Sequence, residues 1–163
     1  GSYLPERYEG LIKFKTFAEQ KGYRLCTHFY MNYRYYLIEK YIKGVKIDKR
    51  FLKFKPLSRQ EYFGLFKKSK VIVDVSNAKQ TGLAMRVLDA FGAGKKVVTT
   101  NKWITKEASY HPKRVSVIDI YNIHVSDSFL GDSIQPTEVD YSIDSWLKNL
   151  FTVKEEVDGT NNG

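Results

Sequence analysis

Apolar positions along this chain follow two patterns, helical spacing and short continuous runs. Helical spacing from Tyr8 to Ala18 predicts a helix over 5–21, with Pro5 in its first turn and Gly22 after its end. The same spacing predicts further helices over 33–42, 57–68, 81–93 and 143–151. Continuous apolar runs predict strands over 71–73, 96–100 and 115–118, with weaker strand candidates over 23–29 and 51–54.

Helices and strands therefore alternate, which predicts a parallel sheet joined by right-handed crossovers. We expect an α/β fold: a three-layer α/β/α Rossmann-like sandwich with a mostly parallel sheet, over residues 1–152. Residues 121–138 are expected to be irregular, and the polar residues 153–163 to form a flexible tail. A doubly wound domain normally begins with a strand, whereas this chain begins with a helix. Either that first strand is missing, or Ser2-Tyr3-Leu4 is what remains of it.

The most distinctive segment is 70–101, which reads KVIVDVSNAKQTGLAMRVLDAFGAGKKVVTTN. It predicts a buried strand, a short polar loop, a helix that starts at Gln80-Thr81-Gly82, and a second buried strand. The start of a helix carries unpaired N–H groups and a partial positive charge, which suit a phosphate or diphosphate. No G-x-G-x-x-G pattern is present, which argues against a dinucleotide cofactor.

Two charged residues of this helix are candidates for ligand contacts. Gly82, Arg86 and Asp89 share one face at helical spacing, opposite an apolar stripe of Leu83, Ala84, Val87, Leu88 and Phe91. Gly82 would let a ligand approach the backbone, and Arg86 would add a bidentate cationic contact. Asp89 would accept hydrogen bonds from a ribose. The alternative is that Arg86 and Asp89 form a surface ion pair with no function.

The segment QTGLAMRVLDAFGAGKKVVTTN, preceded by FKPLSRQEYFGLFKKSKVIVDVS, resembles the C-terminal, nucleotide-sugar-binding domain of bacterial GT-B glycosyltransferases. The resemblance is greatest to the group associated with capsular and lipopolysaccharide sugar transfer, and covers roughly residues 2–120. That group has a Q-(S/T)-G-L-(T/A)-x-R-x-x-E-A block followed by G-x-K-K-(L/V)-(I/V)-T-T-N.

The resemblance implies specific roles for individual residues. Gln80, Thr81 and Gly82 would contact the donor diphosphate with Arg86 beside them, and Asp89 stands where the family usually has a ribose-binding glutamate. Aspartate is one methylene shorter than that glutamate, so Asp89 departs from the family pattern at this position. The loop Lys55-Pro56-Leu57 would lie beside the nucleobase. Asn101 ends the next strand on the ligand side, where a packing or turn role is an equal alternative.

Charge is distributed unevenly along the chain. The net charge is +9, yet residues 1–70 carry 17 basic against 6 acidic side chains, and residues 71–163 carry 10 against 12. The basic half could face an anionic membrane, a nucleic acid or a phosphorylated substrate, or could simply be a solvated surface. No nucleic-acid-binding motif accompanies it, so no nucleic-acid partner is expected. No apolar run reaches the roughly 18 residues that span a membrane.

Other residues with potential chemistry fit no catalytic pattern. His28, His111 and His124 have neither triad nor zinc spacing, so we expect histidines that are solvated or satisfied by hydrogen bonds. Cys26 lies in an apolar stretch and is expected to be buried. Asp74 follows a buried strand, where capping the next loop is favoured over facing a ligand. No metal site and no tightly bound cofactor are expected.

Together these patterns predict the donor-binding domain of a glycosyltransferase acting on a polysaccharide or lipid-linked acceptor. The substrate would be a UDP- or GDP-linked sugar, and the resemblance implies that an N-terminal acceptor domain, absent from this chain, supplies the catalytic base. Such a protein would be cytoplasmic and peripheral to the inner face of the membrane. One alternative is a non-catalytic interaction module whose basic face binds an anionic membrane or nucleic acid. Another is a domain that kept the fold and lost the site.

Overall fold

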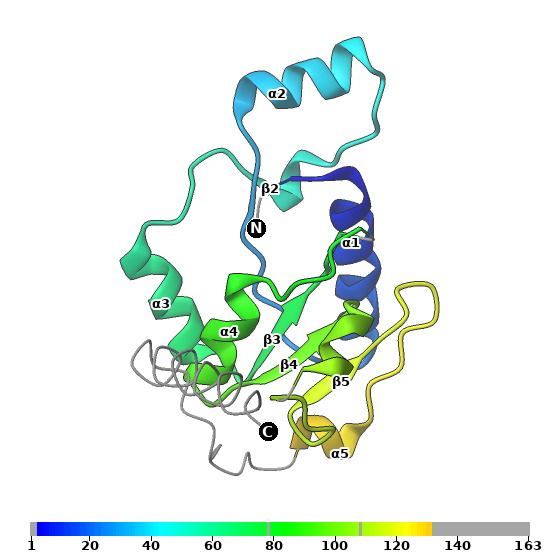
Figure 1. Ribbon diagram of the computed structural model, residues 1–163. Helices are drawn as coiled ribbons and strands as arrows, with labels where there is room; N and C mark the ends of the chain where they lie inside the picture. The colour runs from blue at the N-terminus through cyan, green and yellow to red at the C-terminus, as the bar shows by residue number, and fades with distance from the viewer. Residues whose placement is uncertain (1–2, 78, 108, 132–163) are drawn as a thin grey trace, which may run out of the picture.

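The computed structural model describes residues 3–77, 79–107 and 109–131. Three predicted features lie outside these residues: the helix over 143–151, the tail over 153–163 and the C-terminal limit of the domain. The described part is a mixed α/β structure with two short parallel sheets (Figure 1).

The larger sheet has three parallel strands in the order β3-β4-β5, formed by Val71–Asp74, Lys96–Thr99 and Val115–Val117. The register pairs Val71 with Lys96 and Val97 with Val115. All three strands lie within one residue of the predicted runs. Helix α4 (Met85–Gly92) connects β3 to β4, as expected for a parallel crossover.

Apolar side chains pack on both faces of this sheet. One core cluster combines strand residues with α4 and with α3 (Arg59–Lys68), and includes Phe66, Val87, Phe91 and Val97. A second cluster combines strand residues with α1 (Pro5–Gln20) and α5 (Asp127–Gly131), and includes Phe14, Ala18, Val98 and Phe129. Coverage of both faces explains why these strands read as continuous apolar runs.

The smaller sheet pairs β1 (Phe29–Tyr30) with β2 (Leu52–Lys53) in parallel. Its own core cluster contains Tyr3, Phe29, Met31, Tyr36, Ile47 and Leu52. The backbone N–H of Tyr3 donates to the carbonyl of Tyr30 at 2.9 Å, so the segment before α1 lies along β1 without forming an assigned strand. The single continuous sheet that we predicted is therefore divided, in the part of the chain described, into sheets of two and three strands.

Several predicted helices are confirmed, and their ends have clear local causes. In α3 the Ser58 hydroxyl accepts from the N–H of Glu61 while the Glu61 carboxylate accepts from the N–H of Ser58, and these two bonds form a capping box. Gly22 and Gly44 adopt positive φ angles of 73° and 66° after their helices, as glycine readily does. The helix predicted over 33–42 consists of α2 (Tyr33–Leu37) and a π-helical continuation η1 (Ile38–Ile42).

Several other predictions of secondary structure and burial are wrong. The strand predicted over 23–29 is reduced to β1, because only Phe29 and Tyr30 find a partner strand. A short 3-10 helix η2 (Lys49–Phe51) occupies the start of the segment predicted as a strand over 51–54. Cys26 is exposed rather than buried. The segment predicted as irregular contains α5, and a further 3-10 helix η3 (Lys102–Lys106) follows β4.

Candidate functional site

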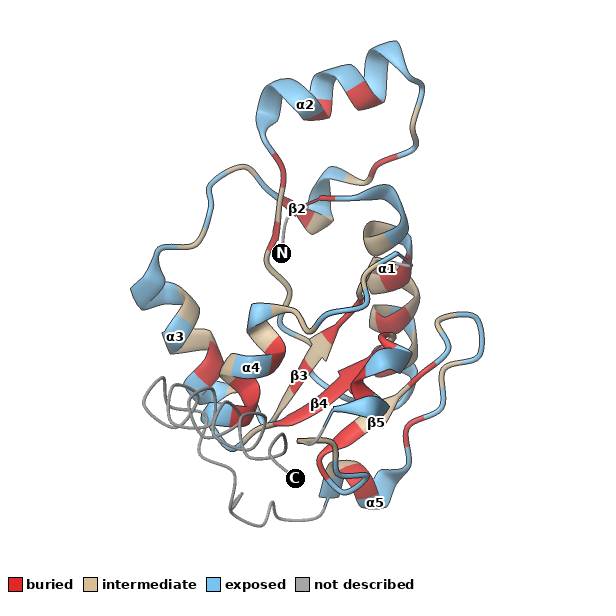
Figure 2. Cartoon of the chain, in the orientation of Figure 1, coloured by how far each residue is buried: buried red, intermediate tan, exposed pale blue. Residues whose placement is uncertain are grey.

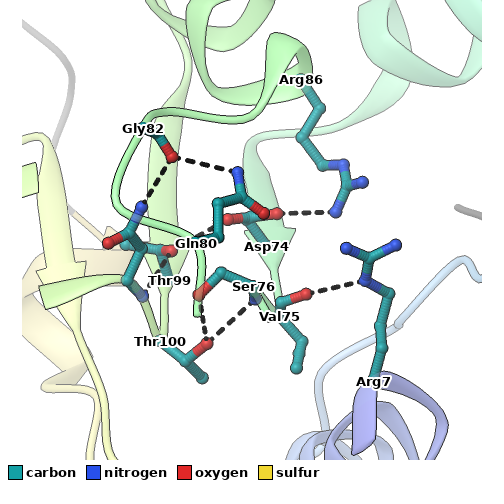
Figure 3. Close-up of polar contacts among 10 residues, drawn as sticks. Arg7, Asp74, Val75, Ser76, Gln80, Gly82, Arg86, Thr99 and Thr100 are labelled. Atoms are coloured by element: carbon teal, nitrogen blue, oxygen red, sulfur yellow. Dashed lines mark hydrogen bonds and ion pairs between the residues drawn. The ribbon is translucent and has the colours of Figure 1, made fainter. Parts of the chain in front are cut away.

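Asp74 lies at the carboxyl end of β3 and organises the polar residues there (Figure 3). Its side chain is 1% exposed. Oδ2 accepts a 3.0 Å hydrogen bond from the Thr99 hydroxyl on the neighbouring strand, and Oδ1 lies 2.6 Å from Nη1 of Arg86 on α4. A buried carboxylate requires such partners, so Asp74 fixes the Arg86 side chain above the end of the sheet. This ion pair replaces both the loop cap predicted for Asp74 and the alternative pairing of Arg86 with Asp89.

A second guanidinium reaches the same place from α1. Nε of Arg7 donates to the carbonyl of Val75 at 3.0 Å, and Figure 3 shows the Arg7 and Arg86 guanidiniums facing one another. Gly10, one turn later, permits this approach, because a Cβ there would lie 2.8 Å from Cγ1 of Val75. Burial lowers the pKa of Arg7, and so does the neighbouring positive charge of Arg86. Two cations thus converge where the strand ends.

The loop before α4 differs from the prediction, because the helix begins at Met85 rather than at Thr81. The carbonyl of Gly82 would accept from the N–H of Arg86 if the helix began earlier. Instead it accepts 3.0 and 3.1 Å hydrogen bonds from the side-chain amides of Gln80 and Asn101. These two bonds keep Gly82 outside the helix.

The amides at the helix start are consequently those of Met85 and Arg86, not those of Thr81 and Gly82. Ala84 is the N-cap residue and has no side chain that can cap them. Thr81 and Gly82 are exposed, and a Cβ placed on Gly82 would meet no atom within 4 Å. The protein's own packing therefore does not require glycine at position 82.

Asp89 is held by α3 rather than by Arg86. Its Oδ2 accepts a 2.7 Å hydrogen bond from the hydroxyl of Tyr62. Burial is the main cause of the raised pKa of Tyr62, and the hydrogen bond to the Asp89 carboxylate is the second cause. The positive charge of Arg86 acts in the opposite direction. Tyr62, Asp89 and Arg86 therefore form one electrostatically connected group that joins α3 to α4.

The raised pKa of Tyr62 predicts a specific loss of stability in alkali. The folded protein keeps the phenolic proton at pH values where the unfolded chain has lost it, so stability falls as pH rises above about 10. Tyr62→Phe removes this contribution and one hydrogen bond worth about 1 kcal/mol. The stability advantage of the wild type over Tyr62→Phe should thus shrink between about pH 8 and about pH 11 in denaturant titrations. Tyr121→Phe, at an exposed tyrosine, should show the same dependence of stability on pH as the wild type. A stability advantage of the wild type over Tyr62→Phe that stays constant with pH would contradict the raised pKa of Tyr62.

The loop Lys55-Pro56-Leu57 lies between β2 and α3, with Lys55 and Pro56 exposed and Leu57 half-buried. The carbonyl of Lys55 lies 2.9 Å from Nε2 of His28, which anchors the loop to the segment before β1. Within the described ranges no hydrogen bond joins the loop to Arg86 or Asp89. Its predicted place beside a nucleobase stays a prediction.

The remaining candidates have structural roles. Asn101 caps η3 by accepting from the N–H of Trp103, in addition to holding Gly82, so the turn role is the one observed. His111 accepts from the N–H of Lys113, and His124 is exposed. Among residues 3–77, 79–107 and 109–131, no three His, Cys, Asp or Glu side chains gather as metal ligands. A shallow hollow lined by Tyr8, Leu11, Ile12, Lys15, Thr27, Phe29 and Phe51 is apolar and shares no residue with the group at the sheet end.

Arg86, Gln80, Gly82 and Asp89 of this region are named by the sequence analysis, whereas Arg7 and Tyr62 are not. Arg7 is 68 positions from its hydrogen-bond partner Val75 and lies in a helix with no motif around it. Tyr62 reads as one more aromatic on the apolar side of α3.

No family model, curated protein or solved structure matched this chain, so the geometry of the site itself must indicate a function.

Proposed function

We propose that this chain binds a nucleotide diphosphate sugar as the donor domain of a glycosyltransferase. The observation that carries the proposal is the convergence of Arg7 and Arg86 over the end of β3. Ligands of open α/β sheets bind outside the carboxyl ends of the strands, and paired guanidiniums match the oxygens of a diphosphate. Burial and then the repulsion from Arg86 lower the pKa of Arg7, and an anion between the two cations would relieve that repulsion.

The other site residues fit around a diphosphate placed there. The N–H groups of Met85 and Arg86 at the start of α4 would add donors to those of the guanidiniums. Gln80, Thr81 and Gly82 would form the wall of the site, with the Gly82 backbone open to close approach. The hydroxyl of Tyr62 fixes Oδ2 of Asp89, and Oδ1 would accept from a ribose hydroxyl. Lys55, Pro56 and Leu57 would border the base.

The chemistry assigned to this domain is stabilisation of the leaving group. An acceptor hydroxyl oxygen forms a bond to the anomeric carbon while the bond from that carbon to the phosphate oxygen breaks. The electron pair leaves with the nucleoside diphosphate, whose growing charge Arg7 and Arg86 would offset. The hydroxyl proton would go to a base on a separate acceptor domain. The proposal includes a three-layer Rossmann-like sandwich, since helices already cover both faces of β3–β5.

Equilibrium titration tests this function. We expect saturable binding of UDP or GDP, with the matching nucleoside binding at least about tenfold more weakly because it lacks the charged group. Gly82→Ala should not lower the stability, because a Cβ there would meet no protein atom within 4 Å. It should lower the affinity several-fold, because the added methyl group would crowd a diphosphate bound against the Gly82 backbone. Gly64→Ala is the matched control, since a Cβ on that α3 glycine also meets no protein atom.

One result would favour an interaction module in place of a donor site. Binding that falls steeply with salt, shows no preference among bases and extends to any polyanion would reflect general basic charge rather than a diphosphate site. Equal affinity for nucleoside and nucleoside diphosphate would contradict the role given to Arg7 and Arg86.

A further inference from the structure

The helix formed by α2 and η1 presents most of its large apolar side chains to solvent. Over residues 33–42 only Tyr36 and Glu39 are buried, at 4% and 3% exposure. Six other apolar residues are exposed, from 37% for Leu37 to 78% for Ile42: Tyr33, Tyr35, Leu37, Ile38, Tyr41 and Ile42. Figure 2 shows this helix as mostly exposed, with buried positions on the side toward the rest of the molecule. Such a cluster on one short element marks an interaction surface.

Helical spacing separates the two sides of the helix. Tyr36 belongs to the core cluster of the smaller sheet, and Glu39 lies one turn after it on the same side. Leu37 and Tyr41 form one i, i+4 pair on the other side, and Ile38 and Ile42 form a second. This is the inverse of an ordinary surface helix, in which the outward positions are polar.

Cationic side chains accompany the exposed apolar ones along this segment. Residues 33–46 contain four basic side chains, Arg34, Lys40, Lys43 and Lys46, all exposed, against one acidic side chain, Glu39. Glu39 is buried, and its Oε1 lies 2.6 Å from Nζ of Lys43. The Lys43 hydrogen bond lowers the pKa of Glu39, which keeps the pair charged at neutral pH. The exposed side chains of this segment are therefore large apolar ones and basic ones, with no exposed acidic side chain among residues 33–46.

Lysine and tyrosine are also arranged as in membrane-interface helices. The Lys40 ammonium lies 5.2 Å from the centre of the Tyr41 ring and donates to the hydroxyl of Tyr36 at 3.1 Å. A lysine can lay its methylene chain along apolar surface while its charge stays in water, and tyrosine prefers the level of lipid headgroups. Among the described residues no helix is long and apolar enough to cross a bilayer.

We propose that α2 and η1 together form a docking surface for an anionic lipid bilayer. Leu37, Ile38, Tyr41 and Ile42 enter the boundary between headgroups and acyl chains, and Arg34, Lys40, Lys43 and Lys46 contact anionic headgroups. The helix lies at one end of the molecule, beyond β1–β2 and away from β3–β5 (Figure 1). This inference is independent of the proposed donor site.

The composition of the surface favours lipid over other partners. Nucleic-acid interfaces are strongly polar, whereas Leu37, Ile38 and Ile42 offer neither hydrogen bonds nor aromatic stacking to bases. The cores of protein interfaces are depleted in lysine, and a second copy of this surface would bring like charges together. A bilayer that contains anionic lipid matches both the aliphatic and the cationic side chains.

Vesicle co-sedimentation tests the proposal, with phosphatidylcholine vesicles compared with vesicles that also contain phosphatidylserine. We expect the wild-type chain to bind only the anionic vesicles. Tyr41→Ser combined with Ile42→Ser should lower the partition coefficient at least about tenfold, since both side chains lose their apolar burial. Lys40→Gln combined with Lys46→Gln should lower it by about tenfold or more. These residues are exposed, so all variants should keep the thermal unfolding midpoint of the wild type.

Matched controls make each outcome decisive. Tyr121→Ser removes another highly exposed tyrosine, and Lys67→Gln with Lys68→Gln removes two charges from α3; both should bind as the wild type does. Equal weakening by the α3 pair would show that general charge, not this helix, drives binding. Equal binding to neutral and anionic vesicles would overturn the proposal. Binding to single-stranded RNA that Tyr41→Ser with Ile42→Ser leaves unchanged would overturn it as well. So would a dimer in solution that these two substitutions dissociate.

Discussion

Arg86→Met is expected to weaken nucleoside diphosphate binding at least about tenfold and to lower the free energy of unfolding by about 2 kcal/mol. The loss of binding follows from removing one of two converging guanidiniums. The loss of stability follows because the Asp74 carboxylate, 1% exposed, would keep only the Thr99 hydroxyl as a side-chain partner. Arg86 is itself 26% exposed, so the stability effect should fall below that of a fully buried ion pair.

A second substitution separates the two effects of Arg86→Met. Asp74→Asn combined with Arg86→Met removes the stranded charge, so stability should recover while binding stays weak. Arg24→Met, at an exposed arginine after α1, should change neither quantity. Isothermal titration and denaturant unfolding give the two measurements. If Arg86→Met destabilised the protein but left nucleotide affinity intact, Arg86 would serve the fold alone.

Phe91→Ala is expected to have the largest effect on stability, about 3–5 kcal/mol, because Phe91 is 1% exposed in the core between α4 and the sheet. The Arg114 guanidinium is also buried, and its centre lies 6.0 Å from the centre of the Phe91 ring. Its nitrogens have no hydrogen-bond partner in the described part of the chain, and the Phe91 ring lies at the outer limit of a cation–π contact with it. Alanine at 91 would leave a cavity and take that contact away.

Leu88→Ala on the same helix is the matched control. Sequence spacing placed Leu88 in the apolar stripe of α4, yet the structure has it 37% exposed. Its truncation should therefore cost less than about 1 kcal/mol in denaturant unfolding. Similar losses for the two variants would show that α4 is not anchored to the sheet through Phe91.

Local sequence signals were sufficient where local physics decides the structure. The runs around Val71, Lys96 and Val115 specify buried parallel strands because helices cover both faces of the sheet. Ser58 and Glu61 specify the start of α3 because both capping bonds join residues three apart. Arg86 was found because helical spacing places it on the polar side of α4.

The parts that were missed depend on contacts between distant residues. The start of α4 was placed too early because Asn101, 19 positions away, holds the Gly82 carbonyl. Arg7 joins the site through the close approach of α1 at Gly10, which no local pattern records. Periodicity predicted the helix over 33–42 correctly, but it could not show that the apolar side would stay uncovered. Cys26 was placed in the interior because its neighbours are apolar, whereas the strand there is too short to include it.

The central claim is that Arg7 and Arg86 form a diphosphate site at the end of β3. A crystal structure of this chain with UDP or GDP tests it most directly. We expect the diphosphate between the two guanidiniums, with its oxygens within about 3 Å of their nitrogens and facing the N–H groups at the start of α4. A nucleotide bound elsewhere, or side chains of the protein filling the space between Arg7 and Arg86, would contradict it.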